Sequence, residues 1–98
     1  MDDADFEWDE AKNVSNQKKH GIRFEDAARV FGDPLMLLFA DGQADGEERW
    51  RAFGHVGGHA IVMVAHAYRD HDGQEKIRII SARTATRHER QIYERENG

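Results

Sequence analysis

The spacing of apolar residues changes along the chain, from a helical period in the first third to a strand period in the middle. Residues 6–8 alternate as Phe-Glu-Trp, which is typical of a very short edge strand. Asp9 follows as a residue able to cap a helix N-terminus, and Gly21 is able to end that helix in the left-handed conformation. The sequence therefore predicts an edge strand and then a helix over residues 10–20.

This first helix carries few apolar residues. Ala11 and Val14 form a thin apolar face, whereas Lys12, Asn16 and Lys19 recur at i, i+4 and i+7 on another face. We therefore expect the helix to lie on the surface and to present a polar stripe.

A second helix is predicted after residue 23, because apolar residues follow the spacing of a core-facing side. The residues of this face are Phe24, Ala27, Ala28 and Phe31. The single proline, Pro34, then stands in a turn signal and separates the helical third from the rest. We expect the second helix to pack on a sheet.

The middle of the chain contains four runs rich in apolar and β-branched residues. The predicted strands span residues 35–40, 48–56, 59–68 and 76–82. The pairs Asp41-Gly42, Gly57-Gly58 and Asp72-Gly73 lie between them and supply the positive φ angles that tight hairpins need. We therefore expect a four-stranded antiparallel meander.

The chain ends in a predicted helix over residues 87–96. Thr86 and Glu89 have the spacing of a capping box, and Ile92 and Tyr93 are the few apolar anchors. The expected fold is thus an α+β domain of a short strand, two helices, a four-stranded antiparallel meander and a C-terminal helix. Because 98 residues suffice for one modest core, we expect a single domain over residues 1–98, with residues 1–5 as a flexible tail.

The charge is uneven along this acidic chain. The formal net charge is −5, with 6 Lys/Arg against 13 Asp/Glu in residues 1–50 and 8 against 6 in residues 51–98. The overall charge argues against binding nucleic acid by general attraction, but the basic second half permits a local positive patch. The chain has no cysteine and no long apolar run, and its start is acidic, so we expect a cytoplasmic protein without membrane association.

A basic cluster lies at the end of the last predicted strand. Strand alternation places Ile77, Ile79 and Ser81 on one face and Arg78, Ile80 and Ala82 on the other. An arginine beside apolar neighbours either pairs with an acid such as Glu48 or faces a ligand. Both interpretations stay open.

Arg83 ends the same strand, and Arg87 follows in the first turn of the last helix. Together they could form a fork for phosphate, whose oxygens accept the paired donors of guanidinium groups. Surface charges on an exposed helix face, such as Lys12 and Lys19, more often only solubilise a protein.

The pattern disfavours a metal site and nucleophilic catalysis. Four histidines lie in the strand region: His55, His59, His66 and His71. The chain has no HExxH motif, His55 and His59 lack an obvious third ligand, and the serines have no triad context. We expect no metal and no cofactor.

Metal-free RNA cleavage is compatible with the remaining residues. It requires a base for the 2′-hydroxyl proton, cations beside the phosphorane and an acid for the leaving 5′-oxygen. Glu48 or His20 is a candidate base, and Tyr93 or His20 a candidate acid. The candidate cations are Arg49, Arg78, Arg83 and Lys19.

Three ordered segments resemble the signatures of the BrnT family. The first contains residues 6–9 (Phe-Glu-Trp-Asp), Lys12, Asn16 and residues 19–22 (Lys-His-Gly-Ile), followed by Phe24, Glu25 and Ala27-Ala28. The second is Glu48-Arg49-Trp50, and the third is residues 77–83 with Ala85, Glu89, Arg90 and Tyr93. The resemblance spans about residues 6 to 94.

The resemblance implies a RelE-like fold and a toxin that cleaves RNA without a metal. It also implies neutralisation by a BrnA-like antitoxin with a ribbon-helix-helix region, so that DNA is contacted only through the antitoxin. Glu48, Arg49, Arg78, Arg83 and Tyr93 are the candidate catalytic residues. The candidate RNA-binding residues are Lys12, Lys19, His20 and Arg87.

A second hypothesis is a non-catalytic protein-binding module of a toxin-antitoxin complex that acts in operon autoregulation. The net acidity favours it, as does an aromatic set that exceeds what a small core hides: Trp8, Trp50, Phe53 and Tyr68. Direct DNA binding has little support, because no predicted helix combines a basic face with a helix-turn-helix pattern.

Overall fold

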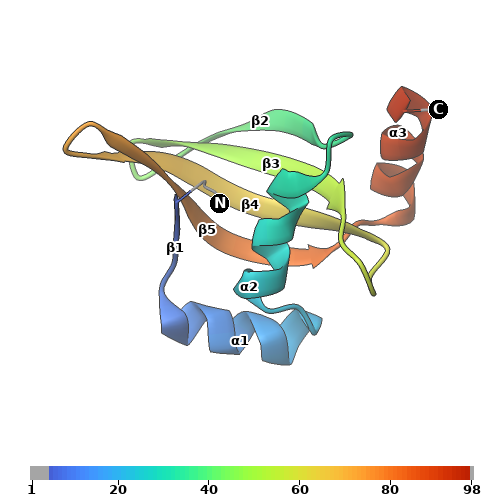
Figure 1. The fold of residues 1–98 in the computed structure, drawn as a ribbon, viewed down its shortest axis with the longest axis horizontal. Coiled ribbons are helices and arrows are strands. Elements are labelled where there is room, and N and C mark those ends of the chain that lie inside the picture. The colour runs from blue at the N-terminus through green and yellow to red at the C-terminus, as the bar shows by residue number, and fades with distance from the viewer. Residues whose placement is uncertain (1–4, 98) are drawn as a thin grey trace.

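The computed structural model describes residues 5–97, which form an α+β fold with one five-stranded sheet (Figure 1). The strands are β1 (Asp5–Glu7), β2 (Leu37–Ala44), β3 (Glu47–His55), β4 (Ile61–His71) and β5 (Gln74–Thr84). The helices are α1 (Glu10–His20), α2 (Phe24–Ala27), the 3₁₀ helix η1 (Ala28–Gly32) and α3 (Arg87–Asn97). The expected tail lies outside the described residues, except for Asp5, which begins β1.

The sheet order is β1-β5-β4-β3-β2, and β2 to β5 form the predicted antiparallel meander. β1 adds a parallel edge beside β5. The predicted caps are also confirmed: Asp9 accepts hydrogen bonds from the first turn of α1, Gly21 ends that helix at φ 74°, and Thr86 with Glu89 forms the capping box of α3.

The predicted turn at Asp41-Gly42 is wrong. These residues form a bulge inside β2, where the register with β3 shifts between Ala40 and Gln43. The hairpin turn comes later, at Asp45-Gly46, where both residues have positive φ. The bulge residue Gly42 also has a positive φ, so the same residue pair serves a bulge as readily as a turn.

The face of α1 that docks on the protein differs from the prediction. Asn16, expected in a surface stripe, is buried, and Val14, expected on the apolar face, is 46% exposed. The amide of Asn16 donates to the carbonyls of Ile22 and Ala82, at 2.9 Å each, and its oxygen accepts from the backbone N–H of Ala82 at 3.1 Å. The Asn16 side chain thus links α1 by hydrogen bonds to the part of the β5 edge that β1 does not pair with.

The second predicted helix is divided into α2 and η1. Its first residue follows Arg23, which makes no capping hydrogen bond with its side chain. The buried Asn13 of α1 accepts the backbone N–H of Phe24 instead, at 2.7 Å. The start of α2 is therefore capped by the preceding helix.

The sheet separates two apolar clusters. On one face, α2 and η1 cover a core that includes Phe24, Val30, Val64 and Ile79. On the other face, α3 packs over a smaller cluster with Phe53, Ile61, Met63, Ala85 and Tyr93. Figure 1 shows α3 at one end of the sheet, so no helix of residues 5–97 lies over the rest of this second face.

The alternation predicted for β5 is wrong after Ile79. In the ladder with β4, Ala65 pairs with Ser81 but His66 pairs with Ile79, so Ile80 is an extra residue in a bulge. The bulge places Ile79 and Ala82 together in the first core. Arg78, Ser81 and Arg83 consequently share the second face, which is a different grouping from the one predicted.

Candidate functional site: an arginine-rich sheet face

Five arginine side chains gather on the second face of the sheet, and we refer to them as the arginine face. They are Arg49 and Arg51 of β3, Arg69 of β4, and Arg78 and Arg83 of β5. Along each strand these arginines alternate with residues of the opposite face, and the bulge at Ile80 keeps Arg78 and Arg83 on the same face.

Small residues separate these arginines. Ala65 pairs with Arg51 on one side and with Ser81 on the other, and Ala67 pairs with Arg78. The aliphatic parts of the long arginine side chains can cover these short residues at the middle of the face. Ala67 is accordingly fully buried.

The arginines of the open part of the face are held by exposed or half-buried carboxylates. Arg69 Nε lies 2.8 Å from Glu47, Arg49 Nε lies 3.6 Å from the same carboxylate, and Arg78 Nη1 lies 3.5 Å from Glu7. Arg49 Nε is buried and makes no hydrogen bond within residues 5–97. Solvent-accessible ion pairs contribute only about 0–1 kcal/mol, so an incoming anion can replace them at little cost.

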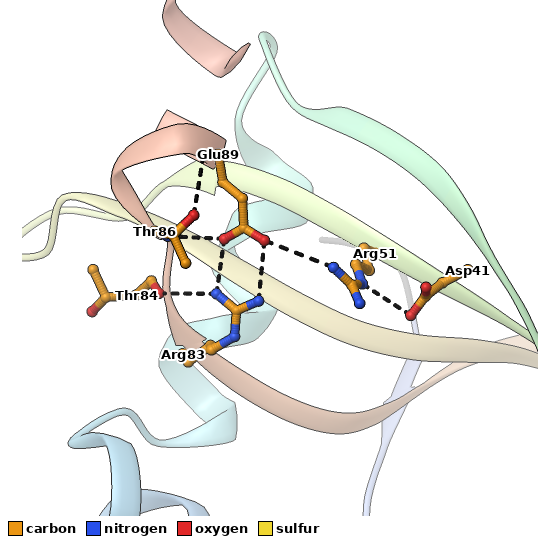
Figure 2. Close-up of polar contacts among 6 residues, drawn as sticks. All are labelled: Asp41, Arg51, Arg83, Thr84, Thr86 and Glu89. Atoms are coloured by element: carbon orange, nitrogen blue, oxygen red, sulfur yellow. Dashed lines mark hydrogen bonds and ion pairs between the residues drawn. The ribbon is translucent and has the colours of Figure 1, made fainter. Parts of the chain in front are cut away.

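A tighter network joins the face to the start of α3 (Figure 2). Arg83 binds Glu89 through both ends of its guanidinium, at 2.8 and 3.1 Å, and Arg51 lies 3.7 Å from the same carboxylate. Arg51 also donates to Asp41 at 2.9 Å. The hydrogen bond from Arg83 lowers the pKa of Glu89 to about 2, against the opposing effect of burial, so this carboxyl is ionised at neutral pH.

The acidic partners balance most of the charge of the arginine face. Five guanidinium groups face four carboxylates, Glu7, Asp41, Glu47 and Glu89, which leaves a local excess of +1 (5 − 4). The face is therefore a set of directed donors in a chain of net charge −5 rather than a broad positive field.

Three of the predicted catalytic residues, Arg49, Arg78 and Arg83, are brought together on this face. Glu48 is not, because it alternates with Arg49 and points to the opposite side of β3. There it is exposed and borders a separate depression with Trp50 and Tyr68. Glu48 therefore lies on the opposite side of the sheet from the arginines, where a general base would have to act.

Tyr93 is also separate from the exposed part of the arginine face. It is 7% exposed, and its hydroxyl donates to Asp33 at 2.5 Å. Burial and this hydrogen bond raise the pKa of Tyr93 to about 12. Asp33 accepts two backbone N–H groups as well, from Leu35 and His55, so Tyr93 ties α3 to the loop before β2.

The predicted RNA-binding residues of α1 lie at the neighbouring sheet edge. Lys12, Lys19 and His20 border a shallow depression of about 190 Å³ whose far side includes Ser81 of β5. Because Ser81 lies next to the arginines, this depression continues the face around the edge of the sheet. Arg87 is exposed at the start of α3, and Arg83 pairs with Glu89. The phosphate-binding fork of Arg83 and Arg87 stays a prediction.

Sequence reasoning missed Arg51, Arg69, Glu89 and His88 as members of this region. Arg51, Glu89 and His88 line a groove of about 340 Å³ between β2, β3 and α3, together with Phe39 and Ile92. The i, i+2 spacing from Arg49 is a signal that points to Arg51. No local signal shows that the capping residue Glu89 also binds two arginines.

Comparison with known proteins identifies the family. The family model for the ribonuclease toxin BrnT of type II toxin-antitoxin systems matches residues 8–89. The chain belongs to this family. The crystal structure of the Brucella abortus ribonuclease toxin BrnT is similar, with a TM-score of 0.63 and 29% sequence identity over 87% of this chain and 100% of that chain. A search of curated proteins found no match.

Membership in the BrnT family confirms the resemblance and the α+β fold predicted from the sequence, and it implies an antitoxin partner. Within residues 5–97 of this BrnT member, no three His, Asp or Glu side chains are grouped as metal ligands would be. No helix of the described part is long and apolar enough to cross a membrane.

Proposed function

We propose that this BrnT member is a metal-independent endoribonuclease that cleaves RNA on the arginine face by attack of a 2′-hydroxyl on the adjacent phosphate. The observation that carries the proposal is the gathering of Arg49, Arg51, Arg78 and Arg83 on one sheet face, which within residues 5–97 is covered by a helix only at the end where α3 packs. Two guanidinium groups that reach one anion, as Arg51 and Arg83 both reach Glu89, can stabilise the charge of a phosphorane without a metal.

The arginines divide into two roles in this proposal. Arg83 and Arg51, at the end of the sheet next to α3, bind the phosphate that is attacked. Arg49 and Arg78, farther along the face, bind the flanking RNA backbone. Lys12 and Lys19 extend this contact around the edge of β5, and Arg87 extends it past the C-terminal end of that strand.

The proton transfers require groups that border the face. His20 stays a candidate, because it lies across the β5 edge from Ser81. His88 is a second candidate, since it lines the groove with Arg51 and Glu89. Histidine is the side chain that most often serves as general base or acid, whereas the locations of Glu48 and Tyr93 suit neither step.

The test is cleavage of a defined RNA by the purified chain in the presence of EDTA. Metal-independent attack by the 2′-hydroxyl predicts products that end in a 2′,3′-cyclic phosphate, and it predicts that a single 2′-deoxy substitution protects the bond that follows it. Cleavage abolished by EDTA and restored by a divalent ion contradicts metal independence. Cleavage of the 2′-deoxy substrate contradicts the attack mechanism.

We further propose that a BrnA-like antitoxin with a ribbon-helix-helix region neutralises this toxin in the cytoplasm and supplies all contact with DNA. The charge supports a division of labour, because a chain of net charge −5 is a poor DNA ligand by itself. Electrophoretic mobility of operator DNA tests this, since the toxin alone should leave the DNA unshifted and the complex should shift it.

One observation favours the alternative of a non-catalytic binding module. Each arginine of the face has a carboxylate within 3.7 Å, so none is a bare cation. The four aromatic residues favour this alternative less than expected, because Phe53 is buried and Trp8, Trp50 and Tyr68 are half-buried. A folded chain that binds its antitoxin and leaves RNA intact under all conditions supports this alternative.

A further inference from the structure

We propose that the carboxylate of Glu89 occupies the position in which Arg83 and Arg51 bind an RNA phosphodiester, so that Glu89 is an internal competitor that sets the affinity for RNA. The inference rests on the proposed function, because it takes the arginine face as the RNA site. It adds a residue of opposite charge whose removal strengthens binding.

The geometry of the contact is that of an anion in a two-arginine site (Figure 2). Arg83 Nη1 and Nη2 lie 2.8 and 3.1 Å from the two oxygens of Glu89, and Arg51 Nη1 approaches the second oxygen at 3.7 Å. A phosphodiester carries two non-bridging oxygens that accept the same paired donors. Carboxylate and phosphate therefore compete for one set of N–H groups.

The location of this pair connects it with the open face. Arg83 is the penultimate residue of β5, where it pairs with Met63, and Arg51 lies on β3 opposite Ala65. The groove of about 340 Å³ beside Arg51 and Glu89 opens the same region to solvent. An RNA strand that follows the arginines along the face thus meets Glu89 at the end of its path.

Glu89 also has a second set of partners that does not involve arginine. Its Oε1 accepts the backbone N–H of Thr86 at 2.8 Å, and its own backbone N–H donates to the Thr86 hydroxyl at 3.1 Å. The capping box therefore holds the start of α3 through contacts that a neutral glutamine also makes. Displacement of the carboxylate from Arg83 does not require α3 to unfold.

The test compares Glu89→Gln with the wild-type chain. Glutamine keeps the capping box and removes the charge that occupies the arginines. The probe is a fluorescein-labelled, fully 2′-O-methylated RNA 12-mer, which lacks the attacking hydroxyl and so reports binding alone by fluorescence anisotropy. The Kd of Glu89→Gln should fall about fivefold, which corresponds to about 1 kcal/mol, the upper end for an accessible ion pair.

Glu94→Gln is the matched control. Glu94 is exposed on the same helix and makes no ion pair within residues 5–97, and its replacement changes the net charge equally. Its Kd should change by less than about twofold, because exposed charges at a distance are screened by salt. Circular dichroism and thermal unfolding establish that both variants are folded.

A measurement on the wild-type chain needs no variant. Titration with inorganic phosphate, followed by the NMR signals of the Arg83 side chain and the Glu89 carboxyl carbon, should shift both signals together along one saturating curve. Shifts confined to Arg69 or to the lysines of α1 overturn the inference.

The outcomes separate the inference from the proposed function. If Glu89→Gln binds the 12-mer as the wild type does, or more weakly, Glu89 positions Arg83 and the inference is wrong, whether or not the wild type cleaves RNA. If Glu89→Gln binds more tightly while neither chain cleaves natural RNA, the inference stands and the proposed catalysis fails.

Discussion

Replacement of Asn16 by alanine should destabilise the protein more than any surface change on α1. The variant removes three buried hydrogen bonds, two donated to the carbonyls of Ile22 and Ala82 and one accepted from the Ala82 backbone N–H. At about 1 kcal/mol net for each bond the loss is about 3 kcal/mol, and partners left unpaired add to it. Alanine recovers about 0.6 kcal/mol through its higher helix propensity. The expected cost is about 2–4 kcal/mol.

Urea denaturation followed by circular dichroism measures this cost. With an m-value of about 1.5 kcal/mol/M for a chain of this size, the midpoint should fall by about 2 M without a change in slope. Ser15→Ala, at the exposed neighbouring position, is the control and should stay within about 0.5 kcal/mol of the wild type. A loss below about 1 kcal/mol for Asn16→Ala would refute the claim that this asparagine fastens α1 to β5.

Two further predictions concern the core. Gly54→Ala should cost about 1–3 kcal/mol in thermal or urea unfolding, because a Cβ there would lie 2.8 Å from Val30 Cγ1 and 3.0 Å from the Val30 carbonyl oxygen. Gly57→Ala, with open space around its Cβ, should change stability by less than about 0.5 kcal/mol, and equal losses for both would contradict the packing argument. Burial lowers the pKa of His66 below 6.5, despite its hydrogen bond to the Val64 carbonyl, so the unfolded state takes up a proton at higher pH than the folded state. The contribution of His66 to the free energy of unfolding should therefore be fully present above about pH 6.5 and fall below that pH by up to about 1.4 kcal/mol per pH unit. A pH series of unfolding curves should show that His66→Gln abolishes this slope. A slope that persists in the variant belongs to another group.

The loss of stability that protonation of His66 causes begins at a higher pH than the loss that protonation of Glu89 causes. Glu89 has a pKa lowered from 4.5 to about 2, so its contribution is present above about pH 4.5 and is lost only as the pH falls further towards 2. A loss of stability that begins between about pH 6.5 and pH 4.5 is therefore assigned to His66 and not to Glu89.

The order and type of the elements could be predicted because each has a local signal. Caps at Asp9, Gly21 and Thr86 depend on residues within one turn, and the apolar periods of the strands depend on nearest neighbours. These signals need no knowledge of the tertiary structure.

The bulges could not be predicted, because a bulge is a property of two paired strands. The extra residue Ile80 exists only relative to the ladder with β4, and it decides which side chains of β5 share a face with Arg78. Periodicity read from one strand alone placed Ala82 beside Arg78, where the structure places Ser81.

The role of Asn16 was hidden for a similar reason. Its partner Ala82 lies 66 residues away, and an asparagine on a helix with lysines around it has the local pattern of a surface position. The arginines of the candidate site were recognised by residue type, whereas their carboxylate partners and the remote position of Glu48 depend on how β3 and β5 are placed in the sheet.

The arginine face is tested most directly by the single-turnover cleavage rate of Arg83→Ala on a defined RNA, compared with Arg95→Ala, whose side chain is 71% exposed at the far end of α3. The account predicts a fall of about a hundredfold or more for Arg83→Ala, the loss typical of one donor to a transition-state oxyanion, and a rate within about twofold of wild type for Arg95→Ala. Arg83→Ala protein that is folded and cleaves at the wild-type rate would contradict it.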